Sequence, residues 1–374
     1  MSDGQAPAAS VADPPGPGFV RRVVNLVGVD NLSLIVALAA LGAAIAFVSP
    51  LLGIHGGENF LSWQNLMNSL AQSVVIVGLL AVGETVVIVG GALDISVGSI
   101  ASVSSVVAAL VVTQGVMGAF GGSPLLGFLG GMLAGMFAGI VNGFIVTVLQ
   151  VNPIIATLGT LAAFDGLAFL LAPDGKPIGI VTHPDFTWLG TGRFLQNLPL
   201  PALGGREWPG VPVMFVVFVI VAVAMHIVMR YTDFGRSVYA IGGNATAARL
   251  AGINVRGIRI VMYMFSGAIA GIAGVLLTAQ TTSGNPINGR GLELQAITAV
   301  FLGGAATAGG RGTIVGTVLA VLLVGVLNNG MNLLGVGQFY QRIALGLLLI
   351  FAVALSQWRQ ARSERARART AALG

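Results

Sequence analysis

Four acidic residues, Glu84, Asp94, Asp165 and Glu293, lie inside or beside apolar stretches that are long enough to cross a membrane. A charged side chain at the centre of a bilayer costs about 2.5–3.5 kcal/mol, so each needs a partner, a water-filled cavity or a place near the membrane surface. A carboxylate inside a membrane protein can line a pore, stabilise a break in a helix or carry an ion. By position we expect Glu84 to face a cavity, Asp165 to find a partner on another helix, and Asp94 to cap a helix near the surface. For Glu293, pore lining and helix capping near the surface both stay open.

Amide and hydroxyl side chains form a second polar group within the same stretches. They offer hydrogen bonds without net charge, which a path for a neutral, hydroxyl-rich solute requires. For any single amide we favour the simpler interpretation, a hydrogen bond between helices, which stabilises by about 0.6 kcal/mol. Together with three of the acids, the candidates for lining a translocation path are Asn68, Gln72, Glu84, Asp94, Ser96, Asn142, Asn152, Glu293, Asn328 and Asn329.

Residue types that carry enzymatic chemistry are scarce. The chain has no cysteine and only three histidines, none of them paired at metal-ligand spacing. Its glycine-rich runs at 90–98 and 303–312 lack the Lys-Ser/Thr ending of a phosphate-binding loop. We therefore expect no catalytic residue, no metal and no cofactor in this chain, and active transport would take its energy from a partner.

The composition places these residues in a membrane. Of 374 residues, 55% are apolar and 8% are charged, and the mean hydropathy is +0.92. A soluble domain carries about 25% charged residues, so a surface this poor in charge must face lipid. The apolar runs are continuous rather than alternating, which favours helices over barrel strands. The sequence predicts an all-α, polytopic membrane protein.

Each span requires roughly 20 apolar residues, and the runs predict about ten transmembrane helices. The pairs that flank Gly90–Gly91 and Gly309–Gly312 are candidates for broken or re-entrant helices. The predicted spans are 32–52, 66–89, 94–113, 124–149, 154–172, 211–229, 259–281, 292–307, 312–330 and 338–356.

The distribution of basic residues orients these spans. With the N-terminus inside, thirteen of the eighteen lysines and arginines lie on the cytoplasmic side. The positive-inside rule then favours both termini in the cytoplasm and an even number of spans, so that eight spans would also fit. We expect a disordered tail over 1–30, a membrane domain over 31–358 with an outer loop at 173–210, and a basic cytoplasmic tail over 359–374.

The long inner loop, 231–258, contains signals for a short helix. Asn244 is a good N-cap, the residues after it favour helix, and Gly252 can take the left-handed C-cap conformation. Such a helix on the cytoplasmic surface either docks into a soluble motor or simply connects two spans. From composition alone both interpretations stay open.

Four segments in a fixed order carry a more specific pattern. They are Gly83–Ser99, Asn152–Thr160, Phe234–Arg236 leading to Ile241–Ile253, and Glu293 through Gly303–Gly304 and Gly309–Gly312 to Gly325–Gly330. Together they resemble the permeases of ribose-type, or simple-sugar, ABC importers, over about residues 60 to 356. Two features depart from the pattern, Glu84 where the family commonly has an uncharged residue, and the proline-rich outer loop.

The resemblance implies a permease subunit in the bacterial inner membrane that pairs as a homo- or heterodimer. Its partners would be an ATPase with two nucleotide-binding domains, which binds ATP and magnesium, and a soluble substrate-binding protein outside the cell. The solute would be a monosaccharide or a similar small polyol. The inner loop would hold a coupling helix that contacts the ATPase through Asn244, Ala247, Ala248, Arg249 and Gly252, so a bulky charged residue in place of Ala248 should uncouple the two subunits.

Three alternatives remain beside this interpretation. In an ion-coupled secondary transporter, Glu84, Asp94 and Glu293 would be the carriers, and uptake would be sensitive to uncouplers. A permease of the related branched-chain amino-acid ABC importers would differ in its substrate. A membrane enzyme has little support, because no His/acid or Ser/His cluster occurs at catalytic spacing.

Overall fold

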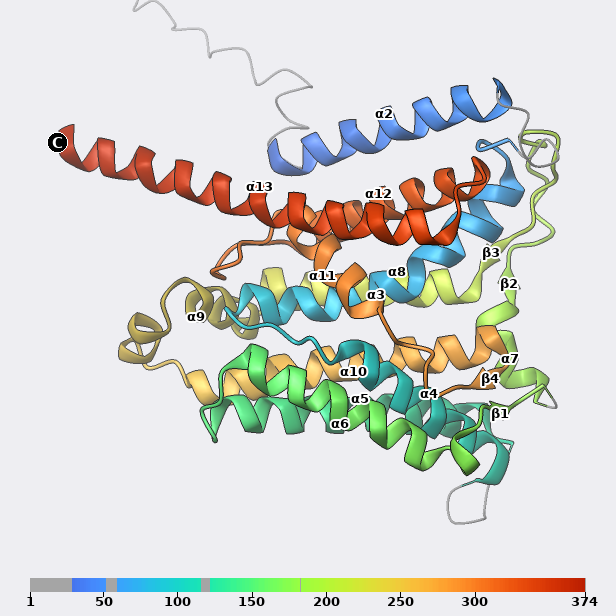
Figure 1. The fold of residues 1–374 in the computed structure, drawn as a ribbon, viewed down its shortest axis with the longest axis horizontal. Coiled ribbons are helices and arrows are strands. Elements are labelled where there is room, and N and C mark those ends of the chain that lie inside the picture. The colour runs from blue at the N-terminus through green and yellow to red at the C-terminus, as the bar shows by residue number, and fades with distance from the viewer. Residues whose placement is uncertain (1–28, 52–58, 116–121, 182, 374) are drawn as a thin grey trace, which may run out of the picture.

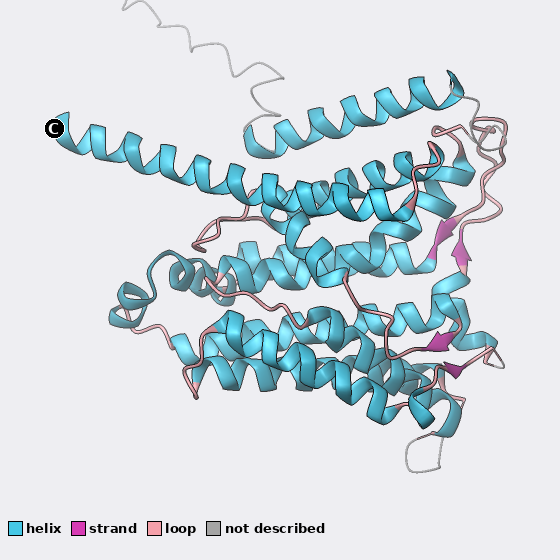
Figure 2. Ribbon diagram, viewed as in Figure 1, coloured by secondary structure: helices cyan, strands magenta, loops and turns pink. Residues whose placement is uncertain are grey.

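The computed structural model describes residues 29–51, 59–115, 122–181 and 183–373, and most of them are helical (Figure 2). Within these residues, nine helical segments are long and apolar enough to cross a membrane. The all-α, polytopic fold is thereby confirmed. The long helices are α2 (Val29–Leu51), α3 (Ala71–Val89, preceded by the π-helix η1, Gln64–Leu70), α4 (Val97–Gln114), α5 (Pro124–Thr147), α6 (Pro153–Leu171), α8 (Val213–Tyr231), α10 (Val255–Thr281), α12 (Ile314–Leu333) and α13 (Gln338–Leu373).

The predicted span at 292–307 is wrong in its second half. Helix α11 (Leu292–Leu302) has eleven residues, about 16 Å, which is roughly half of the hydrocarbon thickness. It ends at Gly303, and the next residue, Gly304, has a positive φ of +92°. A segment of consecutive turns, 285–291, leads back from the outer end to α11 (Figure 1). This pass therefore consists of turns followed by a short helix.

The two ends of the bundle differ in structure (Figure 1). Helix α9 (Asp233–Leu250) lies at one end, where α2 begins and toward which α13 extends. Both described chain ends thus lie on one side, as an even number of passes requires, and the positive-inside rule makes this side cytoplasmic. The opposite end carries α7 (Pro184–Thr191), η2 (Pro173–Gly175) and two antiparallel strand pairs, β1 (Ile178–Gly179) with β4 (Ser283–Gly284) and β2 (Arg193–Phe194) with β3 (Val211–Pro212).

The core forms around α10, which packs against α5, α4 and α3. Gly135 and Gly139 on α5 face Gly267 and Gly271 on α10, where a Cβ atom at either α5 position would overlap backbone atoms of α10. Small residues at such a seam let two helix backbones approach closely and gain van der Waals contact. The high glycine content therefore has a packing role here.

The structure describes the predicted C-terminal tail but almost none of the predicted N-terminal tail. Residues 1–28, nearly all of the predicted N-terminal tail, lie outside the described residues. At the other end α13 continues through the predicted tail to Leu373, so this stretch is a continuation of the last helix.

Candidate functional site

A short helix at the cytoplasmic end is set apart from the rest of α9 by a break at Asn244. This residue has extended backbone angles, φ −161° and ψ 99°. Its Oδ1 accepts hydrogen bonds from the backbone N–H groups of Thr246 and Ala247, each at 3.0 Å. Asn244 is thus the N-cap of a new helical turn, as predicted. The residues before it, 233–243, were predicted as loop and are helical.

The same short helix ends at Gly252, which has a φ of +84°. The Gly252 N–H donates to the Arg249 carbonyl and the Ile253 N–H donates to the Ala248 carbonyl, both at 3.0 Å. These two hydrogen bonds define a Schellman motif, which satisfies carbonyl groups that a helix end leaves free. The predicted C-cap is confirmed, and the short helix is rigidly closed at both ends.

Of the five contact residues that the sequence suggested on this helix, Ala248 is the one that does not face outward. Ala248 is only 5% exposed and packs with Val255 in a small apolar cluster. A bulky residue there would disturb the packing of the helix against the chain, so a substitution at Ala248 does not separate docking from local packing. Ala247 and Arg249 are exposed, and Leu250 is 85% exposed. A large apolar side chain held out from a capped helix is suited to insertion into a partner.

Three glycine pairs meet where α9 joins the bundle. The Gly310 N–H donates to the Val89 carbonyl at 2.8 Å. A Cβ atom on Gly242 would overlap that same carbonyl oxygen, and one on Gly309 would lie 2.7 Å from the Cα of Gly91. We call the pairs 90–91, 242–243 and 309–310 the glycine junction. It joins α9 directly to the two places where the chain leaves α3 and enters α12.

A buried polar cluster holds the break between α3 and α4. Glu84 Oε1 accepts the Asp94 N–H at 2.9 Å, and Asp94 Oδ1 accepts the Ser96 N–H at 3.0 Å. Asn142 Nδ2 donates to Ser96 Oγ at 2.7 Å. All four residues have 0% exposure. Asp94 therefore stabilises the start of α4, as expected of a cap, from a place buried inside the protein. Glu84 is fully buried and bonded to the same break, so the expectation that it faces a cavity is wrong.

The remaining amides do not converge on one path. Asn329 and Asn65 exchange two hydrogen bonds between their side chains, at 2.9 and 2.8 Å, in a buried contact of α12 with η1. Asn152 caps α6 by accepting the Ile154 N–H at 3.0 Å. Both arrangements are structural hydrogen bonds, as we favoured for single amides. The other three candidates, Asn68, Gln72 and Asn328, are half-buried on η1, α3 and α12.

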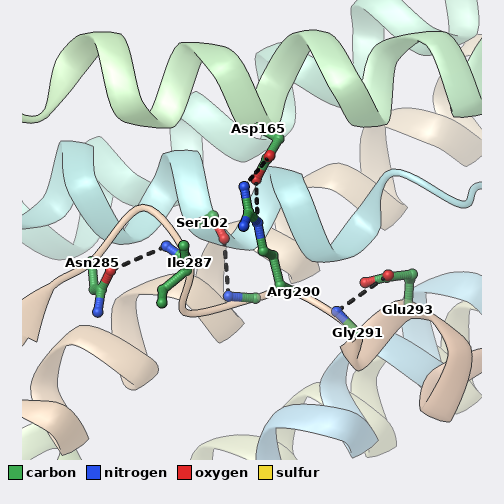
Figure 3. Close-up of polar contacts among 8 residues, drawn as sticks. Ser102, Asp165, Asn285, Ile287, Arg290, Gly291 and Glu293 are labelled. Carbon is green, nitrogen blue, oxygen red and sulfur yellow. Dashed lines mark hydrogen bonds and ion pairs between the residues drawn. The ribbon is translucent and has the colours of Figure 1, made fainter. Parts of the chain in front are cut away.

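The turn segment before α11, residues 285–291, is held by polar contacts from α4, α6 and the first turn of α11 (Figure 3). Ser102 on α4 accepts the Gly289 N–H at 2.9 Å. Asp165 on α6 accepts the Nε–H of Arg290 at 2.9 Å and also pairs with its Nη2. Asp165 thus finds a partner, as predicted, although the partner lies on this segment and not on a helix.

Glu293 reaches back from the first turn of α11, where its Oε1 accepts the Gly291 N–H at 3.2 Å (Figure 3). A carboxylate in this position satisfies a free N–H group and interacts favourably with the positive end of the helix. Of the two roles left open for Glu293, this contact is the capping one.

Sequence reasoning missed Arg290, Asn65 and Leu250. Arg290 is one of the five basic residues that the predicted topology leaves outside the cytoplasmic side. An arginine directly before an apolar helix and an unpaired acid in a neighbouring span together suggest an ion pair. Asn65 and Leu250 carry no comparable local signal, since their roles depend on a distant residue and on the orientation of a short helix.

Comparisons with known proteins find similarity to transport permeases along most of the chain. Residues 65–353 match the family described as "Branched-chain amino acid transport system / permease component". The chain is 43% identical over 304 residues to the ribose import permease protein RbsC of Bacillus subtilis, covering 81% of this chain and 88% of that protein. It is 37% identical over 343 residues to RbsC of Escherichia coli K12, covering 91% and 98%. It is 35% identical over 331 residues to the L-arabinose transport system permease protein AraH of Escherichia coli K12, covering 88% and 92%. No solved structure matches the chain.

Proposed function

The chain belongs to this family of importer permease components, and we propose that it forms the membrane path for a monosaccharide or a similar small polyol in an ABC importer. The observation that carries the proposal is the similarity over 81–91% of the chain to permeases named for ribose and L-arabinose. Because both of those sugars are aldopentoses, aldopentoses are the first substrates to test.

The chain is a transport component and not an enzyme, and a separate subunit hydrolyses ATP. We assign ATP and magnesium to that subunit. In this chain the glycine-rich segment at 309–312 is occupied with backbone packing, since Gly309 and Gly310 lie against Gly91 and Gly243.

The short helix after Asn244 is the proposed docking element for the ATPase. Its two caps fix its shape, and the exposed Leu250, Ala247 and Arg249 supply apolar contact and charge. A movement of the ATPase would pass through α9 into the glycine junction. From there it would reach the break after α3 and the start of α12, which alternate the path between outward and inward openings.

Two rival functions are less well supported. An ion carrier must exchange with water, whereas Glu84 and Asp94 are fully buried and hold the chain break, and Glu293 caps α11. A branched-chain amino-acid permease would fit the family description. However, the three relatives described above, at 35–43% identity, carry the names of sugar permeases.

The protein is a multi-pass membrane protein, and we place it in the bacterial inner membrane, where the ATPase has access to cytoplasmic ATP. A soluble binding protein would deliver the sugar to the outer end, formed by α7 and the two strand pairs. A second permease, either an identical copy or a related chain, would complete the path.

Uptake in a strain that lacks this protein tests the proposal. We expect loss of uptake of one labelled monosaccharide or polyol from a panel that begins with ribose and L-arabinose. In the parent strain, that uptake should resist an uncoupler at constant ATP and stop when ATP is depleted. Loss of leucine or valine uptake, or uptake that stops with the uncoupler at constant ATP, would contradict it.

A further inference from the structure

A pocket of about 470 Å³ opens between α11 and α13. Its polar lining comes from Arg290, Gln295 and Thr298 on the α11 side and from Arg342 on α13. Pockets that bind small molecules measure about 300–1,000 Å³ and combine apolar walls with a few polar groups. The size and lining therefore match a site for one small solute.

The ion pair beside this pocket lies at membrane depth. Asp165 is six residues, about 9 Å, from the outer end of α6. It binds Arg290, whose side chain remains 54% exposed in a single copy of the chain. An exposed guanidinium facing lipid would be costly, so this face must meet water, a solute or protein.

The chemistry of the pair fits a neutral, hydroxyl-rich solute. The two hydrogen bonds to Asp165 use two of the five N–H donors of the Arg290 guanidinium, and the carboxylate balances its charge. The remaining donors, with the amide of Gln295, can bind hydroxyl groups without attracting ions. By contrast, the sequence-predicted candidates Asn142 and Asn329 are buried and already bonded inside the chain.

We propose that the pocket between α11 and α13 is the part of the translocation path where the sugar hydroxyls bind, with Arg290 and Gln295 as contact residues. The sugar identity rests on the proposed function, whereas the presence of an aqueous pocket does not.

Cysteine labelling tests the pocket directly, because the natural chain has no cysteine. Gln295→Cys lies on α11, and Gly346→Cys places a side chain in open space on α13. Val223→Cys on α8 is the matched control, at a side chain that is 52% exposed. The assembled importer, with and without a non-hydrolysable ATP analogue, is treated on each face with a charged, membrane-impermeant methanethiosulfonate.

Both pocket cysteines should react at least about tenfold faster than the control in at least one state, because a charged reagent does not enter hydrocarbon. If either of them reacts only at the control rate in every state and from both faces, the pocket is not aqueous and the proposal is overturned.

Uptake then tests the contacts. Gln295→Leu should slow sugar uptake about two- to tenfold, the effect of one lost hydrogen bond. Gln114→Leu, at the outer end of α4, should leave it unchanged. Unaltered uptake in Gln295→Leu would remove this residue from the site. Labelling requires no sugar, so fast labelling in a protein that transports no sugar would overturn the proposed substrate and keep the path.

Discussion

Leu250 and Ala248 lie two positions apart on one short helix and have opposite surroundings. Ala248 is buried against the chain, and Leu250 projects into open space. A leucine that is 85% exposed at the tip of a capped helix adds nothing to the packing of this subunit. Its apolar surface is stabilising only if a partner covers it, which makes Leu250 the residue that reports on docking.

Replacing Leu250 with serine should weaken binding of the partner ATPase. Burial of a leucine side chain contributes about 1.5–3 kcal/mol, which corresponds to about a tenfold or greater change in Kd. The matched control is Leu149→Ser, at an exposed leucine beyond the inner end of α5. Affinities of the purified ATPase for the permease in nanodiscs measure the difference. Equal Kd values for Leu250→Ser and the unaltered protein would remove the short helix from the docking surface.

Residue types predicted the local features well and the distant ones poorly. Asn244 and Gly252 were recognisable as caps because cap hydrogen bonds form within a few residues along the chain. The orientation of Ala248 was not predictable, because alanine fits either face of a helix. Asn329 pairs with a residue 264 positions away, and no pattern in one sequence links the two.

At the scale of elements, the glycine junction explains how a surface helix can act on the interior. Where three backbone segments contact one another without side chains between them, a displacement of one segment displaces the others. Gly242 and Gly243 offer a direct comparison, because a Cβ atom on Gly242 would overlap the Val89 carbonyl whereas one on Gly243 would meet nothing within 4 Å.

Gly242→Ala should therefore separate α9 from the junction and Gly243→Ala should not. Overpacking at such a contact costs about 1–3 kcal/mol, so Gly242→Ala should lower the Tm of the permease and reduce sugar uptake per ATP hydrolysed. In Gly243→Ala both values should match the parent, or the Tm should rise slightly, since alanine favours helix by up to about 1 kcal/mol. Indistinguishable behaviour of the two variants would show that close contact at the junction is unimportant.

The helices were predictable to the extent that lipid-facing apolar runs define them. Eight of the long passes start and end within a few residues of the expected positions, and α13 starts where expected but continues to Leu373. Helix α11 is shorter than the predicted span because the chain leaves the helix at Gly303–Ala306 while the apolar run continues. Apolar composition alone does not distinguish a turn from a helix. The helical part of α9 before Asn244 was missed because Asp233–Gly243 contains three glycines, which disfavour helix, and two charged residues.

For the whole molecule, charge distribution and similarity to known permeases give one consistent arrangement. The proposed docking helix in α9 lies at the cytoplasmic end, and the strand pairs and α7 lie at the outer end (Figure 1). The ion pair of Arg290 with Asp165 lies six residues from the outer end of α6. The buried acids stabilise the break in the chain between α3 and α4. They are therefore not available to carry an ion across the membrane. The whole-molecule account therefore requires that ATP alone drives uptake.

Reconstitution measures this requirement most directly. The permease, its partner ATPase and the binding protein are placed in proteoliposomes without any ion gradient, and the labelled sugar identified by the uptake panel is supplied on the side of the binding protein. The account predicts accumulation above the outside concentration that depends on ATP and on the binding protein, and that persists with a protonophore. Accumulation that requires an imposed proton or sodium gradient, with ATP having no effect, would contradict it.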